Sequence, residues 1–187
     1  MKKSIILSVF ALTVVFYGFS QENKTHLNNA PFIDIWPLFV GGLNDGFGIT
    51  LGYEAAPLRQ LSIVNSFTFL QYSTDINNQD INILTLGYKL RGRFYPLSSA
   101  VDKLFIGLGF NYTYVYGYGE IDNKKDGNIW EFAIDLGWKF IFIQGPFLEI
   151  SCGYKPKIAS DLDVEKISPT IPKPAWLEYG IALGWAF

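Results

Sequence analysis

Apolar and polar residues alternate with a period of two along most of the chain. At the C-terminus, bulky residues occupy the odd positions from Leu177 to Phe187, and glycine, alanine or a glutamate occupies the even positions between them. Successive side chains of a β-strand point to opposite faces of a sheet. The pattern therefore predicts a strand with one bulky apolar face and one small or polar face.

The same alternation recurs upstream and predicts eight strands in all. The clear segments cover residues 47–54, 84–93, 104–115, 130–140, 148–155 and 177–187, and weaker ones cover residues 32–39 and 61–72. A short motif also repeats, as LGYE at 51, LGYK at 86, LGFN at 108, LGWK at 136, CGYK at 152 and LGWA at 183. Gene duplication and repeated selection for one two-faced environment both account for this repeat, and we favour the second.

Ionisable side chains in the clear strands all fall on the small, glycine-rich face. A soluble sandwich or lipocalin buries its apolar face, but here the apolar side chains are too large and numerous to share the inside of a small barrel. Lipid outside and a polar lumen inside fit this arrangement. The predicted fold is all-β, a closed antiparallel eight-stranded transmembrane β-barrel of the outer-membrane type. The predicted lumen charge network is Glu54, Lys89, Arg91, Arg93, Glu131, Asp135, Lys139, Glu149, Lys155 and Glu178.

The N-terminus has the layout of a secretory signal peptide. Two lysines precede an apolar run from Ile5 to Val15, and small residues follow at Gly18 and Ser20. An uncleaved membrane anchor is the alternative, but the run is shorter than the ~20 residues that a helical span needs. We expect a signal peptide over residues 1–20, a short periplasmic tail over residues 21–30 and the barrel domain over residues 31–187.

Composition supports a lipid environment. The chain is 49% hydrophobic and 17% aromatic, which conflicts with the polar surface of an ordinary secreted domain. The single Cys152 cannot form an internal disulfide that would stabilise such a domain. A net charge of −2 gives no reason to expect nucleic-acid binding.

By this pattern, residues 31–187 resemble the small eight-stranded outer-membrane barrels, the class that includes the OmpA transmembrane domain and OmpX. The most specific element is the C-terminal alternation, which resembles the family's assembly signal. The resemblance implies the cell outer membrane of a diderm bacterium, a monomer, and outer-membrane lipid, the barrel-assembly machinery and periplasmic chaperones as partners. No peptidoglycan-binding domain follows, so a wall-tethering role is not implied. The assembly signal would comprise Tyr179, Ile181, Leu183, Trp185 and Phe187.

Residues with catalytic or metal-binding chemistry are few. The only histidine, His26, lies in a polar stretch before the first strand. Barrels that modify lipid A resemble this fold class and use a serine with a histidine base, so we predict no enzyme activity. Cys152 falls on the lipid-facing parity. Two acidic stretches, residues 122–127 and 161–165 with Asp161, Asp163 and Glu165, depart from calcium-loop patterns, so we expect solvated loops and no metal or cofactor.

Two interpretations of the lumen charges differ in function. Opposite charges in a confined interior fit a network that fills the barrel, whereas a narrow ion path would make the protein a small porin-like pore. Eight strands enclose barely enough room for side chains, which favours filling. We therefore predict a structural or surface-interaction role carried by external loops, the longest being residues 156–174, for a surface ligand that the sequence does not identify. A small pore is the alternative, followed by a lipid-modifying enzyme.

Overall fold

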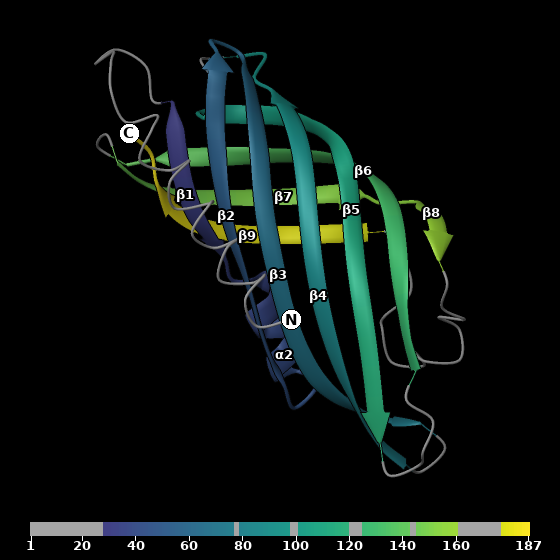
Figure 1. Ribbon diagram of the computed structural model, residues 1–187. Coiled ribbons are helices and arrows are strands. Elements are labelled where there is room, and N and C mark those ends of the chain that lie inside the picture. Colours follow the sequence, from purple (N-terminus) through teal and green to yellow (C-terminus); the bar gives the residue numbers. More distant parts are fainter. Residues whose placement is uncertain (1–27, 77–78, 98–100, 120–124, 143–144, 161–176) are drawn as a thin grey trace, which may run out of the picture.

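The computed structural model describes residues 28–76, 79–97, 101–119, 125–142, 145–160 and 177–187, which form a β-barrel with one short helix (Figure 1). The elements are β1 (Asn29–Asp34), α2 (Trp36–Gly42), β2 (Phe47–Leu58), β3 (Leu61–Ile76), β4 (Gln79–Phe94), β5 (Lys103–Gly119), β6 (Lys125–Ile141), β7 (Pro146–Tyr154), β8 (Lys157–Ser160) and β9 (Leu177–Trp185). Strands β3 to β6 are the longest, with 16 or 17 residues each.

Eight of the described strands close a ring in which all neighbours are antiparallel. Strands β1 to β7 pair in chain order, and β9 pairs with both β7 and β1. Strand β8 pairs with β6 just beyond the end of β7, so it prolongs the β7 side of the ring. The closed antiparallel eight-stranded barrel predicted from the alternation is therefore confirmed.

The first and last strands, β1 and β9, meet at a seam that closes the ring. Asn29 N–H donates to the carbonyl of Phe187 at 3.0 Å, and Phe187 N–H donates back to Asn29 at 2.9 Å. Further along, Ile35 N–H donates to the carbonyl of Ile181 at 2.8 Å. The last residue of the chain therefore belongs to the barrel wall.

Register places the two kinds of side chain on opposite faces of this wall. Between β5 and β6, for example, Gly107 opposes Asp135 and Leu108 opposes Ile134. Leu108 and Ile134 are exposed on the outside, and Gly107 is buried inside. The exposed large hydrophobic residues of the other ring strands follow the same alternation, except Leu58 beyond the register shift of β2, so the outer surface is predominantly apolar.

The prediction of a strand over residues 32–39 is wrong in its second half. Strand β1 ends at Asp34, and α2 follows from Trp36 to Gly42. Pro37 has no N–H for a sheet ladder but fits the first turn of a helix. The Asp34 carboxylate accepts a hydrogen bond from Trp36 N–H at 2.9 Å, which helps to turn the chain at this point.

The expected loop 156–174 also differs at its start, because residues 157–160 form β8. The register between β6 and β8 shifts at Trp130 and Glu131, and Pro156 lies at the junction. A proline at such an irregularity removes no regular ladder hydrogen bond. Residues 161–174 lie outside the described part of the chain.

An apolar core fills the lumen at the end of the barrel where Asn29 pairs with Phe187. Three inward phenylalanine rings each lie on a glycine of the paired strand. A Cβ on Gly52 would lie 2.1 Å from Phe32, one on Gly137 2.2 Å from Phe105, and one on Gly184 2.5 Å from Phe147. The recurring glycines therefore leave room for large side chains across the barrel. Ala30, Val64, Tyr95, Val101, Ala182 and Ala186 complete this core.

Candidate functional site

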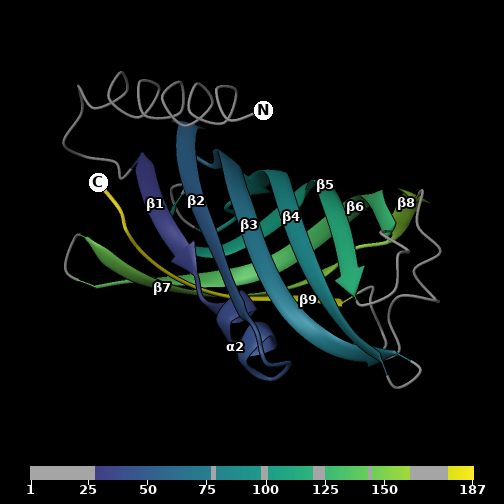
Figure 2. The ribbon, with the colours of Figure 1, turned by 60° about the horizontal axis from the view of Figure 1, so that its bottom comes forward.

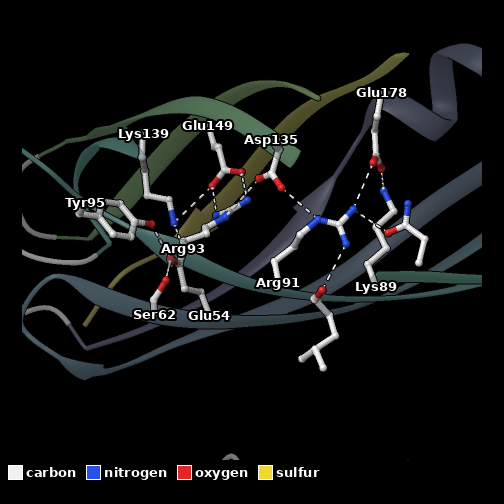
Figure 3. A network of polar contacts seen from close by, with 12 residues as sticks. Glu54, Ser62, Lys89, Arg91, Arg93, Tyr95, Asp135, Lys139, Glu149 and Glu178 are labelled. Atoms are coloured by element: carbon white, nitrogen blue, oxygen red, sulfur yellow. Dashed lines mark hydrogen bonds and ion pairs between the residues drawn. The ribbon is translucent and has the colours of Figure 1, made fainter. Parts of the chain in front are cut away.

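The inner face of the barrel carries a ladder of charged side chains along its length. Figure 3 shows Lys139, Glu54 and Tyr95 at one end, Arg93, Asp135 and Arg91 between, and Lys89 and Glu178 at the other. Each group points inward because it lies at one of the alternate strand positions whose side chains face the lumen. The ladder consists of two four-charge clusters and a further ion pair.

The first cluster centres on the Glu54 carboxylate, which is fully buried. It accepts hydrogen bonds from Lys139 Nζ, Ser62 Oγ and Tyr95 Oη, and from Arg93 Nη1 at 3.2 Å. Four donors on one carboxylate satisfy its acceptor capacity.

Glu149 completes the first cluster from β7. Arg93 donates to its two carboxylate oxygens at 2.9 and 2.7 Å, and Lys139 Nζ lies 3.3 Å away. This two-pronged geometry is the strong form of an arginine–carboxylate pair. Two acidic and two basic side chains therefore balance within a site that is almost sealed from solvent.

The second cluster is built around Arg91. Its guanidinium donates from Nε to Asp135 at 3.0 Å and from Nη2 to Glu178 at 3.3 Å and to Asn111 at 2.6 Å. Lys89 also donates to Glu178. This cluster again holds two acids and two bases. Arg91 Nη1 donates to the carbonyls of Leu90 and Phe110 at 3.2 and 3.0 Å, so the barrel wall itself fixes the guanidinium.

Further contacts join these groups into one chain. Arg93 Nε lies 3.8 Å from Asp135, which links the two clusters. Asn111 donates to Glu131 at 3.2 Å, and Lys155 Nζ lies 3.7 Å from the same carboxylate. The structure therefore brings together all ten inward residues named from the sequence. It also assigns the individual pairs, which the alternation alone does not.

Aromatic rings close the ladder at its apolar end. The Arg93 guanidinium lies 3.9 Å from the centroid of the Phe105 ring, and Lys139 Nζ lies 4.3 Å from that of Phe147. Cations over ring faces are attracted by the ring quadrupole, most strongly where water is excluded. The first charged cluster and the apolar core are thus packed directly against each other.

Little open space remains among the charges. A cavity of about 60 Å³ is lined by residues of both clusters, including Arg91, Arg93, Asp135 and Glu149. Such a volume can hold a few water molecules between polar groups. Arg93 Nε, which also borders this region, is the one buried side-chain polar atom of the described residues without a hydrogen-bond partner in the protein.

Sequence reasoning missed four polar members of the site. Ser62 and Tyr95 lie on Glu54, and Asn111 bridges Arg91 and Glu131. Asp34 is buried on the inner face of β1, where Trp36 and Ile181 donate their backbone N–H groups to it. All four have inward parity, so extending the parity rule to uncharged residues and to the weak strands would have found them.

The remaining sequence candidates lie apart from the ladder. Cys152 is exposed on the outer face of β7. His26 and the stretch with Asp161, Asp163 and Glu165 lie outside the described residues. Within the part of the chain that the structure covers, no group of three acidic, histidine or cysteine side chains is placed to hold a metal ion.

The C-terminal residues proposed as an assembly signal line the outside of β9 and the chain end. Tyr179, Leu183, Trp185 and Phe187 are exposed, and Ile181 is half-buried. Their backbones pair with β7 and β1. The segment is thus both an apolar stripe and the strand that closes the ring.

Comparisons with protein families, with characterised proteins and with solved structures found no match to this chain. No helix among the described residues has the length and apolar character to cross a membrane.

Proposed function

We propose that the protein is an outer-membrane β-barrel with a filled lumen, whose external loops carry a structural or surface-interaction role. One observation carries the proposal. The outer face of the ring carries many exposed large hydrophobic residues, while the ten ionisable groups of the ladder point inward and pair with one another. Water would penalise that outer surface, whereas the hydrocarbon of a bilayer matches it.

Closure of the ring supports the same environment. Every strand of a spanning sheet needs partners on both edges, because a bilayer offers no water to unpaired N–H and C=O groups. The seam between β1 and β9 meets this need from the Ile35–Ile181 bond to Phe187. The signal-peptide layout of residues 1–20 is consistent with export to an envelope membrane.

The filled lumen favours a structural role over conduction. Glu54 and Lys139 are fully buried, aromatic rings pack against the first cluster, and the cavity among the charges is about 60 Å³. We therefore propose that the external loops, and not the lumen, make the protein's interactions with other molecules. The segment that follows β8 is the longest of these connections.

Conductance in planar bilayers separates the filled barrel from the pore. The wild type should show little steady current. Arg91→Ala should raise ion leakage, because it leaves Asp135 and Glu178 with fewer partners and admits water. Thr85→Ser, a mild change on the inner face, is the matched control. A large, stable wild-type conductance that Arg91→Ala does not alter would reject the filled lumen.

A pull-down tests the surface role. Cells that carry the wild type and cells that carry a variant shortened within residues 161–174 would be compared for captured surface partners. The variant leaves β8 and β9 intact, so barrel assembly should be unchanged. Capture of the same partners by both proteins would argue against recognition through this loop.

A further inference from the structure

The ring has a notch in its wall next to the β1–β9 seam. Strand β1 ends at Asp34, where it pairs with Thr50 of β2 and Ala182 of β9. Both neighbours continue beyond that level, β2 to Phe47 and β9 to Leu177. Residues 47–49 of β2 and 177–181 of β9 therefore lack a β1 partner, and only the backbone bond from Ile35 to Ile181 spans the base of the notch.

Helix α2 lies in this notch. Figures 1 and 2 show it following β1 and lying beside the end of β2. A Cβ on Gly48 would lie 2.6 Å from the Pro37 carbonyl, and one on Gly41 would lie 2.8 Å from the Phe47 backbone. On the other side, the rings of Trp36 and Tyr179 are 5.6 Å apart. The helix thus packs against both strands that border the notch.

The backbone of this segment satisfies itself. Leu43 N–H donates to Phe39 at 3.0 Å, Asn44 N–H donates to Gly41 at 2.9 Å and Gly46 N–H donates to Gly41 at 2.8 Å. The side chain of Asn44 donates to the Val40 carbonyl at 2.8 Å. A helix whose C-terminal N–H groups are hydrogen-bonded can face hydrocarbon at low cost, because its backbone polar groups find partners within the segment.

One side of α2 and its C-cap is apolar, and two of its three residues are exposed. Trp36, Phe39 and Leu43 follow the i, i+3, i+7 spacing of one helix face, and the rings of Trp36 and Phe39 are 6.2 Å apart. Phe39 is 53% exposed and Leu43 is 86% exposed. No ionisable residue occurs between Asp34 and Asp45. A helix at a hydrated barrel rim would be expected to carry charge on such a face.

We propose that α2 is a lipid-facing part of the wall, and that the side formed by Trp36, Phe39 and Leu43 binds acyl chains of the bilayer. This inference rests on the proposed outer-membrane location. Acyl chains are the expected binding partner because this face is continuous with the apolar outer surface of the barrel. Exposed Tyr179 and Phe47 on the bordering strands join the two. Trp36 and Tyr179 are also the amphipathic ring types that gather near a membrane interface.

Fluorescence quenching by lipid tests the inference. The chain has five tryptophans. One variant would keep only Trp36 and a matched control only Trp138, which lies on the outer face of β6, with phenylalanine at the other four positions. Both would be folded into vesicles whose acyl chains carry bromine, and folding would be checked by heat-modifiable gel mobility. We expect bromolipid to quench both to a comparable extent, and aqueous iodide to quench neither strongly.

The control separates failure of the inference from failure of the proposed location. Quenching of Trp138 but not Trp36 by bromolipid would overturn the inference and leave the membrane barrel intact, whether Trp36 were then open to iodide or covered by protein. Quenching of neither would overturn both. If the Trp36 variant does not fold, a Trp36→Phe, Phe39→Trp protein moves the probe by one turn and gives the same decision.

Discussion

Replacing Glu54 with glutamine should destabilise the barrel more than the same change at the less buried lumen acid Glu131. Glu54 is fully buried and accepts four hydrogen bonds, two of them from the cations Lys139 and Arg93. Glutamine keeps the shape but removes the charge and presents an N–H₂ group toward donors. Lys139 then retains only Glu149, at 3.3 Å, as an acidic partner.

The size of the effect follows from burial. Removing one partner of a buried ion pair costs about 3–5 kcal/mol, because the other charge stays buried without compensation. Glu131→Gln is the matched control. Its partner Lys155 lies 3.7 Å away, and the two side chains are 27% and 13% exposed for lysine and glutamate. The longer distance and the greater exposure of this pair mean that the loss for Glu131→Gln should be smaller than the loss for Glu54→Gln.

Urea unfolding in lipid vesicles, followed by tryptophan fluorescence, measures both free energies. The Glu54→Gln, Lys139→Met double variant should recover part of the loss, because Arg93 and Glu149 still balance each other. A double-mutant cycle gives the coupling between the two sites. A loss for Glu54→Gln no larger than that for Glu131→Gln, or strict additivity with Lys139→Met, would refute the reasoning.

Two further changes test the packing and the chain end. Gly137→Ala places a Cβ within 2.2 Å of Phe105 and should cost about 1–3 kcal/mol of unfolding free energy. Phe105→Leu in the same chain should restore part of it, and a neutral Gly137→Ala would contradict the packing account. Deleting Phe187 removes the backbone bonds that join the chain end to β1, so the protein should not accumulate in the outer-membrane fraction. Phe187→Tyr keeps those bonds and should assemble, whereas wild-type levels of the deletion variant would reject the assembly signal.

The period of two was enough to predict the ring and the facing of its side chains. In strands with clean alternation, such as β5 and β6, parity alone separates Leu108 and Ile134 outside from Gly107 and Asp135 inside. A one-residue change in register would exchange these faces, so the pattern is a strong constraint.

The alternation does not predict which lumen charges pair with each other or where the first strand ends. Parity places Arg93 and Glu149 inside, but their distance depends on how strands far apart in sequence are staggered around the ring. The segment after Asp34 is apolar without alternation, and local turn chemistry at Pro37 decides for a helix. The value of glycine in the repeated motif also became clear only when its cross-strand phenylalanine was known, as for Gly137 and Phe105.

Spin-label accessibility along the outer face of β5 tests the central claim most directly. Single cysteines at Leu104, Ile106, Leu108, Phe110, Tyr112 and Tyr114, in a Cys152→Ser background, would each carry a nitroxide in vesicles. We expect mobile labels that collide with dissolved oxygen more often than with a water-soluble nickel complex. The ratio of oxygen to nickel accessibility should be highest near Leu108 and lower toward Leu104 and Tyr114. Labels equally open to the nickel complex at all six positions, or shielded from both reagents, would contradict a lipid-facing outer surface.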